Sequence, residues 1–256
     1  MKNNSLIDLS GKCALVTGGS RGIGAAVCRQ LAGAGANIMI GYRTRKTDAE
    51  NVVDSCRSAG VKAACFAADL STDEGAKALV DATVTELGAL DIFVGNAGIW
   101  PPVDVALADM SDDQWHRTLR ENVDSIFFTT RAAIRVMPDG GSIVLISSTA
   151  GQRGESFHAD YAASKGAVIS LTKSLAVELG SRDINVNSVA PGWVDTEMVS
   201  DAVADAGRNR ITASIPIGRI ATADDIAGPV VFLCSSMSQH ITGEILNVNG
   251  GAVLCG

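Results

Sequence analysis

The stretch from residue 13 to residue 24, Cys-Ala-Leu-Val-Thr-Gly-Gly-Ser-Arg-Gly-Ile-Gly, constrains the fold of this chain more than any other. Residues 13–17 are apolar and closed by glycines, which predicts a buried strand, and residues 22–34 repeat apolar side chains at helical spacing. A glycine turn between a strand and a helix favours a phosphate site, because glycine lets the backbone approach a diphosphate and the helix N-terminus presents free N–H groups. The alternative is a tight turn without a ligand. The match to the common G-x-G-x-x-G pattern is partial, since Val27 takes the place of the third glycine.

Strand-like and helix-like segments alternate along the whole chain. We expect strands at 13–17, 37–42, 62–67, 91–94, 142–146, 184–189 and 244–248. We expect helices at 22–34, 47–59, 72–87, 111–137, 161–179 and 223–235, and an irregular or partly helical segment at 193–219. This order predicts an α/β fold, a single domain over residues 1–256 in which helices cover both faces of one parallel sheet of about seven strands. In such sheets ligands bind beyond the carboxyl ends of the strands, where glycine and polar residues of this chain repeatedly fall.

Composition and charge exclude several classes of protein. The chain carries 28 acidic and 21 basic side chains, a net charge of −7, so nonspecific binding to nucleic acid is not expected. No run reaches the roughly 18 apolar residues of a membrane span, and the N-terminus has no apolar signal-peptide core. The six cysteines are scattered without a C-x-x-C pair, which favours a reduced, cytoplasmic protein over a disulfide framework or a metal site.

The sharpest chemical signal is Tyr161-Ala-Ala-Ser-Lys165. The tyrosine and the lysine are four residues apart on an expected helix, so they share a face. A lysine cation about 4–6 Å from a phenol stabilises the phenolate and lowers the phenol pKa from about 10. The alternative is a solvated tyrosine beside a surface lysine. Ser148, at the end of an expected strand, is suited to bond a substrate oxygen or to cap a helix, and Asn122, considered alone, is expected to face solvent.

Together these residues resemble the short-chain dehydrogenase/reductase family over roughly residues 8–251. The motifs appear in order as Thr17-Gly-x-x-x-Gly-x-Gly24, Asp69, Asn96-Ala-Gly98, Asn122, Ser148, Tyr161-x-x-x-Lys165 and Pro191-Gly192. The resemblance implies a Rossmann-type doubly wound sheet, a nicotinamide cofactor, and the catalytic residues Asn122, Ser148, Tyr161 and Lys165. It implies cofactor contacts at Gly18, Ser20, Arg21, Gly22, Ile23, Gly24, Tyr42, Arg43, Thr44, Asp69, Leu70, Asn96, Ala97, Gly98, Tyr161, Lys165, Pro191, Gly192, Val194 and Thr196. Two departures, Gly95 for the asparagine usual before Asn96 and Asn249 for the aspartate of the terminal V-D-G-G, leave the four catalytic positions intact.

The resemblance also implies a role for each catalytic residue. Tyr161 would give a proton to a carbonyl oxygen during reduction and take it back during oxidation. Lys165 would lower the pKa of Tyr161 and hold the nicotinamide ribose, and Ser148 would bond the substrate oxygen, where negative charge develops. Asn122 would bend its helix and place a water that links Lys165 to solvent. A dinucleotide-binding regulator without catalysis is the alternative from another class of protein, and it needs none of these four side chains.

The cofactor is expected to be NADP(H). A site specific for NAD usually places an acid about 20 residues after the glycines, bonded to the ribose 2′-hydroxyl. Here Tyr42-Arg43-Thr44 occupies that place, and no acid precedes Asp48. Arg21 in the glycine turn and Arg43 are therefore predicted to hold a 2′-phosphate between two cations, the alternative for each being a solvated surface charge.

The substrate is less constrained than the cofactor. The pocket walls are expected at 99–105, 153–160 and 193–220, with His158 interpreted as a surface loop residue. These walls mix Trp100, Trp193, Met198 and Ile211 with Arg153, Arg208 and Arg210. We favour a 3-oxoacyl thioester, because the motifs and the segment Pro216-Ile-Gly-Arg219 resemble acyl-carrier-protein reductases, and a sugar, a polyol or a cyclic ketone is the alternative. Arg117, Arg120, Arg131 and Arg135 are expected either to dock a carrier protein or to form a solvated helix face.

A homotetramer is expected, because members of the family commonly assemble through the helix that holds the tyrosine and through the last strand. The expected helix 161–179 carries a small, apolar face suited to close helix approach. That face consists of Ala162, Ala163, Ala167, Ala176 and Val177.

Overall fold

The computed structural model describes residues 6–254, apart from the side chains of residues 205 and 206. One parallel sheet contains β1 (Cys13–Thr17), β2 (Asn37–Tyr42), β3 (Ala63–Ala67), β4 (Ile92–Gly95), β5 (Ser142–Ile146), β6 (Asn185–Pro191) and β7 (Ile245–Val248). Their spatial order is β3-β2-β1-β4-β5-β6-β7, so the direction of winding reverses beside β1. This doubly wound α/β arrangement confirms the predicted fold class.

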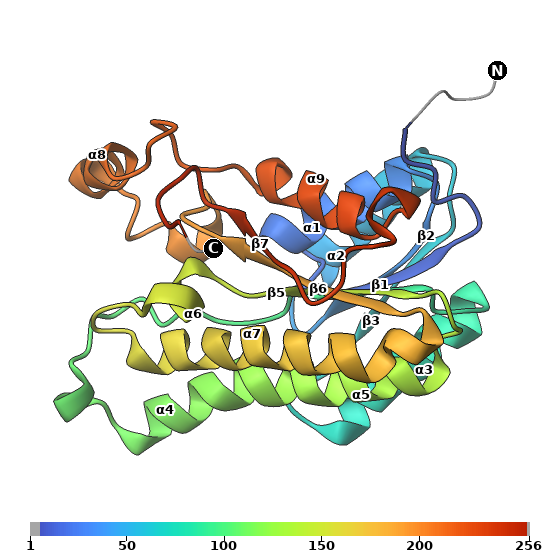
Figure 1. The fold of residues 1–256 in the computed structure, drawn as a ribbon, viewed down its shortest axis with the longest axis horizontal. Coiled ribbons are helices and arrows are strands. Elements are labelled where there is room, and N and C mark those ends of the chain that lie inside the picture. Colours follow the sequence, from blue (N-terminus) through green and yellow to red (C-terminus); the bar gives the residue numbers. More distant parts are fainter. Residues whose placement is uncertain (1–5, 255–256) are drawn as a thin grey trace.

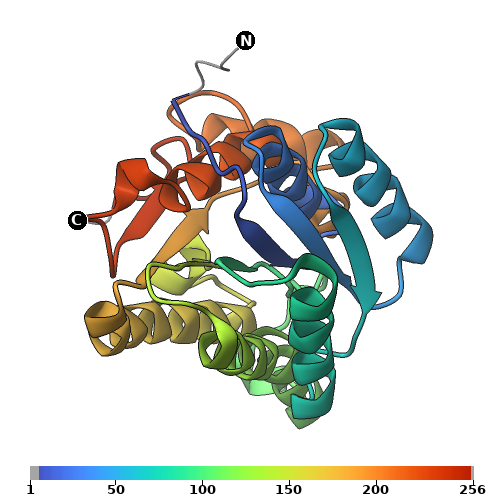
Figure 2. The same cartoon turned by 90° about the vertical axis from the view of Figure 1, so that its right-hand side faces the viewer.

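Helices cover both faces of the sheet (Figure 1), and the view turned by 90° separates the two layers (Figure 2). One layer contains α1 (Gly22–Gly33), α2 (Lys46–Ser58) and α9 (Ala223–Leu233), and the other contains α3 (Asp73–Leu87), α4 (Asp112–Leu119), α5 (Ser125–Val136) and α7 (Ala159–Leu179). Shorter helices are α6 (Thr149–Arg153) and α8 (Asp205–Ala213), and single turns are η1 (Leu107–Asp109), η3 (Gly180–Arg182), η4 (Glu197–Val199) and η5 (Ser236–Ser238).

Two apolar cores hold the helices against the sheet. Successive side chains of a strand point to opposite faces, so Val16 packs with α1 and α9 through Val27 and Val230. Leu15, its neighbour in β1, packs on the other face with residues such as Leu79 of α3. Because every strand of the sheet runs parallel, the two cores fix all the carboxyl ends at one edge, where the predicted site residues lie.

The expected helix 111–137 is interrupted. α4 ends at Leu119, the π-helical turn η2 (Arg120–Asp124) follows, and α5 begins at Ser125. Asn122 lies in η2 and its side chain is fully buried, so the expectation that it faces solvent is wrong. The wider turn directs this side chain inward to the backbone of Ile99, and π-helical turns often mark functional sites in this way.

Candidate active site

The glycine turn between β1 and α1 forms a cradle with room for a phosphate. Gly18 and Gly22 have φ angles of +63° and +54°, a region that favours glycine. A Cβ atom on Gly24 would lie 2.3 Å from the carbonyl oxygen of Gly18, so α1 could not pack this closely with any larger residue. Arg21, at the N-cap of α1, makes no side-chain capping bond, which leaves the first N–H groups of the helix directed at the cavity. These residues therefore fit the diphosphate of a dinucleotide.

The end of β4 is fastened to this cradle. The Asn96 side-chain amide donates to the carbonyl oxygens of Thr17 and Gly18 at 2.9 and 3.2 Å. The Thr17 hydroxyl accepts from the backbone N–H groups of Asn96 and Ala97 at 2.9 and 3.0 Å. The expected cofactor motifs at 17–24 and 96–98 thus form one rigid unit.

Two adjoining cavities form a continuous cleft along the carboxyl edge of the sheet. Both are lined by Ile23, Asn96, Gly98, Ile99, Thr196 and Met198. Of the predicted cofactor residues, the first cavity adds Gly18, Ser20, Arg21, Gly22, Tyr42, Arg43, Thr44, Asp69, Leu70 and Ala97. The second adds Ser148, Tyr161, Lys165, Pro191, Gly192 and Val194. The structure thus brings the predicted catalytic and cofactor residues to one cleft, with Gly24 and Asn122 behind its walls. Of the predicted substrate walls, Arg208, Arg210 and Ile211 line neither cavity: Arg208 pairs with Asp195, and Ile211 lies in a separate apolar cluster.

Lys165 and Tyr161 lie one turn apart on α7. The Lys165 Nζ atom donates to the carbonyl oxygen of Ile146 at 2.9 Å and lies 5.8 Å from the centre of the Tyr161 ring. Lys165 is only 6% exposed, and burial lowers its pKa to about 8. Burial raises the pKa of Tyr161 to about 12, although a hydrogen bond with Ser148 opposes the shift. The pKa of Tyr161 is thus raised overall, not lowered as expected, because the loss of hydration dominates.

Ser148 and Asn122 support this pair from two sides. Ser148 is the N-cap of α6, and its hydroxyl accepts from the backbone N–H of Ala150 at 3.1 Å while it also contacts Tyr161. The Asn122 amide accepts from the N–H of Ile99 at 2.7 Å and donates to its carbonyl oxygen at 2.9 Å. It also donates to the Ser164 hydroxyl at 3.0 Å, one residue before Lys165. Ser148 can therefore cap α6 and still face the substrate cavity, so the two roles expected for it are compatible.

Aromatic rings form the outer part of the second cavity. The Trp100 ring stacks on His158 at 4.6 Å and meets the edge of Trp193 at 6.1 Å. Its indole N–H donates to Glu155 at 3.2 Å, and burial raises the pKa of the Glu155 carboxyl. His158 is 3% exposed and its Nε2 atom lies 2.9 Å from the carbonyl oxygen of Pro101, so the interpretation of His158 as a surface residue is wrong.

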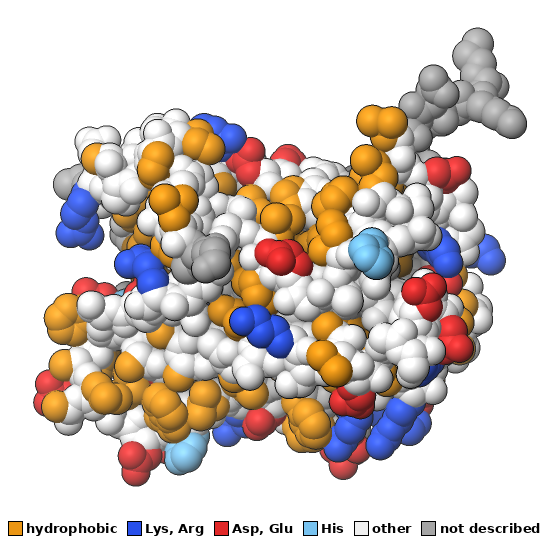
Figure 3. All heavy atoms as spheres, in the orientation of Figure 1, with side chains coloured by type: hydrophobic (Ala, Val, Ile, Leu, Met, Phe, Trp, Pro, Cys, Tyr) orange, Lys and Arg blue, Asp and Glu red, His pale blue; other side chains and the backbone are white. Residues whose placement is uncertain are grey.

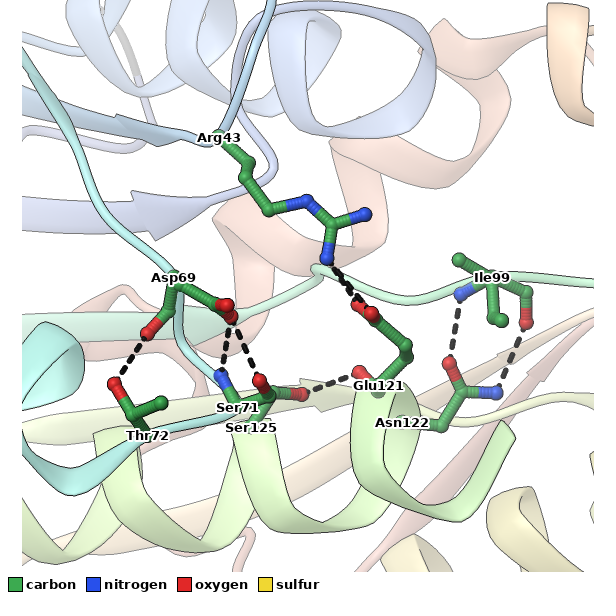
Figure 4. A network of polar contacts seen from close by, with 8 residues as sticks. All are labelled: Arg43, Asp69, Ser71, Thr72, Ile99, Glu121, Asn122 and Ser125. Carbon is green, nitrogen blue, oxygen red and sulfur yellow. Dashed lines mark hydrogen bonds and ion pairs between the residues drawn. The ribbon is translucent and has the colours of Figure 1, made fainter. Parts of the chain in front are cut away.

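The arginines predicted to hold a 2′-phosphate line the first cavity, each paired with a carboxylate. Figure 4 shows Arg43 reaching to Glu121, whose two carboxylate oxygens lie 2.7 and 2.6 Å from Arg43 Nη1. Arg21 pairs with Glu197 at 2.5 Å, and Arg45, which was not predicted, lies 3.4 Å from the same carboxylate. Sequence reasoning missed both glutamates, although Glu121 directly precedes the motif residue Asn122.

Comparison with known proteins gives the family. A family model described as enoyl-(acyl carrier protein) reductase matches residues 18–253. The chain is 38% identical over 242 residues to the 3-oxoacyl-[acyl-carrier-protein] reductase FabG of Staphylococcus aureus, covering 94% of this chain and 97% of the relative. The chain belongs to the short-chain dehydrogenase/reductase family. FabG of Salmonella typhimurium is 40% identical over 247 residues, covering 96% of this chain and 98% of that protein.

Solved structures of the family agree with this assignment. A short-chain dehydrogenase/reductase from Serratia marcescens is 39% identical, with a TM-score of 0.90 and coverage of 95% of this chain and 98% of that chain. A short-chain dehydrogenase from Burkholderia cenocepacia, solved in complex with NADP, is 38% identical with the same TM-score of 0.90 and the same 95% and 98% coverage.

The two departures from the family motifs have structural reasons. A Cβ atom on Gly95 would lie 2.8 Å from Leu145 Cδ2 and 2.9 Å from Ile126 Cδ1, so a larger residue here would require these side-chain ends to shift. Asn249 accepts from the N–H of Gly251 and donates to the carbonyl oxygen of Val253, both at 2.9 Å, so its amide closes the turn after β7. Within residues 6–254, no three His, Cys, Asp or Glu side chains are grouped to hold a metal ion. No described helix is long and apolar enough to cross a membrane.

Proposed function

We propose that the chain is an NADP(H)-dependent oxidoreductase that reduces the keto group of a 3-oxoacyl thioester to a secondary alcohol. The observation that carries the reaction class is the meeting of Ser148, Tyr161 and Lys165 in one cavity that adjoins the glycine cradle. Arg21 and Arg43 at the rim of the cradle support the phosphorylated cofactor. A regulator without catalysis has no use for a buried lysine beside a half-buried tyrosine.

In this mechanism Tyr161 is the proton donor. Its pKa of about 12 keeps the phenol protonated at neutral pH. NADPH, when bound, supplies the hydride, and residues of the glycine cradle, Arg43 and Lys165 hold it in the cleft. Ser148 donates a hydrogen bond to the carbonyl oxygen, where negative charge develops during reduction. Lys165, 5.8 Å from the tyrosine ring, stabilises the phenolate that remains after Tyr161 has given up its proton.

The relatives support the thioester as substrate. Proteins named 3-oxoacyl-[acyl-carrier-protein] reductase match 94% or more of this chain at 38–40% identity. The cavity beside Tyr161 has apolar walls at Ile99, Trp193 and Met198 that suit an acyl chain.

The test is turnover of acetoacetyl-CoA with NADPH and with NADH. We expect turnover with NADPH and a clear preference for it. Tyr161→Phe should lower kcat by about 100-fold or more, because general acid catalysis contributes on the order of 10²–10⁴. NADPH affinity of this variant should change less than about twofold, since the phenol oxygen is not needed for binding. Persistent turnover in Tyr161→Phe, or equal kcat/KM with both cofactors, would contradict the proposal.

One observation favours a second candidate, a small hydroxylated ketone. Glu155 places a carboxylate in the substrate cavity, and Trp100 and Trp193 place flat rings beside it. A carboxylate accepts hydrogen bonds from hydroxyl groups, whereas an unsubstituted acyl chain offers it no donor. Glu155→Gln should therefore raise KM for a hydroxylated ketone by about tenfold, the value of one bond to a charged group, and leave KM for acetoacetyl-CoA unchanged. The opposite pattern would remove this candidate.

Docking of a carrier protein is proposed for the exposed arginines of α4, η2 and α5. Arg117, Arg120 and Arg135 are exposed. Arg131 is engaged within the protein, because it pairs with Asp73 at 2.5 Å and lies 4.7 Å above the Phe127 ring. We expect Arg120→Glu to raise KM for a carrier-bound substrate and to leave KM for the CoA thioester unchanged. An equal effect on both substrates would contradict carrier docking.

Assembly as a homotetramer is proposed through α7 and β7. Val177 of α7 is 85% exposed, and all residues of β7, the edge strand, are partly exposed. Hydrophobic side chains also gather over the lower helices of the face drawn in Figure 3. Exposed apolar side chains of this kind favour contact with another copy of the chain.

A further inference from the structure

The ion pair between Arg43 and Glu121 joins two parts of the cleft that differ in rigidity. Glu121 belongs to η2, its side chain is 18% exposed, and its backbone carbonyl accepts from the Ser125 hydroxyl at 2.6 Å. The neighbouring Asn122 is fixed to the backbone of Ile99. Arg43 follows β2 on a loop and its side chain is 49% exposed. The carboxylate is thus the fixed partner, and the arginine is the partner that can move.

This pair lies across the part of the cleft where the adenosine of a dinucleotide must bind. The diphosphate belongs at the glycine cradle and the adenosine ribose at the end of β2, so the base extends toward the ends of β3 and β4. Arg43 and Glu121 line that cavity together with Asp69, Ser71 and Ile99. In Figure 4 the guanidinium crosses from the end of β2 to η2, between the Asp69–Ser71 turn on one side and Ile99 on the other.

The guanidinium has donors to spare in this position. Only Nη1 bonds to Glu121, and no other described residue accepts a bond from Nε or Nη2 of Arg43. A phosphate group is bound by two guanidinium donors at once and carries more charge than a carboxylate. A 2′-phosphate is therefore a better partner for Arg43 than Glu121 is.

We propose that Glu121 holds Arg43 across the adenosine pocket as a gate, and that NADPH opens the gate by transferring Arg43 from the carboxylate to its 2′-phosphate. This inference rests on the proposed function. Every nucleotide must break the Arg43–Glu121 pair to enter, so the cost of opening is common to NADPH and NADH. Only NADPH gives Arg43 a new partner. Glu121 thus lowers the affinity for both cofactors, and Arg43 alone provides the preference between them.

The test measures dissociation constants by calorimetry for NADPH, NADH and 2′,5′-ADP, with no turnover involved. Glu121→Gln should lower the dissociation constants of NADPH and NADH by the same factor, about two- to fivefold, the strength of a partly exposed ion pair. Arg43→Gln should weaken the binding of NADPH and 2′,5′-ADP, because the phosphate loses its partner. It should strengthen the binding of NADH, because the gate is removed as well. In the Arg43→Gln background, Glu121→Gln should no longer change NADH binding.

Asp81→Asn is the matched control. It raises the net charge by the same amount as Glu121→Gln and breaks an exposed pair with Lys77, far along α3 from the cleft. We expect it to leave all three dissociation constants unchanged, and thermal melting of every variant checks that the fold is intact.

Four results would overturn the gate. If Glu121→Gln weakens the binding of NADPH but not of NADH, the carboxylate only orients Arg43 toward the phosphate. If it strengthens the binding of NADPH but not of NADH, Glu121 competes with the phosphate for Arg43 within the bound complex. Unchanged affinities in a folded Glu121→Gln variant would show that the pair does not block entry. Failure of the wild-type protein to bind any of the three nucleotides would instead refute the proposed cofactor, and the gate with it.

Discussion

Replacing Lys165 with methionine should stabilise the protein at neutral pH while it removes activity. The lysine is buried, and its pKa is lowered to about 8 from an ordinary value of 10.5. At about 1.4 kcal/mol for each pKa unit, the folded state disfavours the charged lysine by roughly 3 kcal/mol. Methionine removes this cost. It also leaves the carbonyl oxygen of Ile146 without its hydrogen-bond donor, and this loss reduces the gain in stability by about 1–2 kcal/mol. We expect a net gain of about 1–2 kcal/mol in the free energy of unfolding at pH 7.

The sign of this difference should reverse as the pH rises. Between pH 8 and pH 10.5 the folded protein has released the Lys165 proton while the unfolded chain still holds it. The unfolded state then binds more protons, so raising the pH stabilises the wild-type protein relative to the variant. Below pH 8 both states are protonated and the full cost remains. By about pH 10 the wild-type protein should be the more stable of the two, by about 1 kcal/mol.

Urea unfolding followed by circular dichroism at pH 7, 8, 9 and 10 measures this curve, because urea does not screen charge. Other titrating groups are common to both proteins and cancel in the difference. Lys173→Met on the exposed side of the same helix is the control, and its difference from wild type should not vary across this pH range. A Lys165→Met protein less stable than wild type at pH 7, or a difference that stays constant from pH 8 to pH 10, would refute the reasoning.

Three further changes should have separable effects. Asn122→Ala removes three hydrogen bonds, two of them to Ile99, and should lower the free energy of unfolding, measured in urea, by about 2–4 kcal/mol. A variant that loses turnover but keeps its stability would contradict a structural role for Asn122. Gly24→Ala places a methyl group against the carbonyl oxygen of Gly18, so the affinity for NADPH, measured by calorimetry, should fall at least about tenfold. An unchanged affinity would show that the cradle does not need this close approach. Val177→Asp should shift the mass by light scattering from tetramer toward smaller species, and a wild-type protein that is already monomeric at micromolar concentration would refute the proposed assembly.

The alternation of elements could be predicted from the sequence because each strand and helix carries its own local pattern. The boundaries of β2 and the existence of all seven predicted strands agree with the structure. The family resemblance implied a bend at Asn122, but the apolar pattern alone did not show the break at η2. One wide turn shifts the helical repeat by about a single residue, and the apolar pattern of α4 and α5 tolerates it. The short α6 also escaped, since five residues are too few to show a period.

The site residues that could be predicted from the sequence are those that local patterns show, and the contacts that could not are those made only by folding. The glycines and the spacing of Tyr161 and Lys165 are local, so they could be read from the sequence. The pairing of Arg43 with Glu121 joins residues 78 positions apart, and that of Arg21 with Glu197 joins residues 176 apart. No local pattern shows which carboxylate will lie beside an arginine after folding. Burial of His158 escaped for the same reason, because it depends on stacking against Trp100.

Burial moves the pKa values of Lys165 and Tyr161 in opposite directions, and at neutral pH both groups still largely hold their protons. With a pKa of about 12 the phenol stays protonated at neutral pH and is ready to donate, whereas oxidation of an alcohol must begin from a phenolate. With a pKa of about 8 the lysine remains largely a cation at pH 7. Proton donation then creates a phenolate 5.8 Å from that buried cation, where their attraction is stronger than in solvent. Burial therefore keeps the resting tyrosine protonated and raises the cost of forming its anion, and the Lys165 cation offsets part of that cost once the carbonyl has taken the proton.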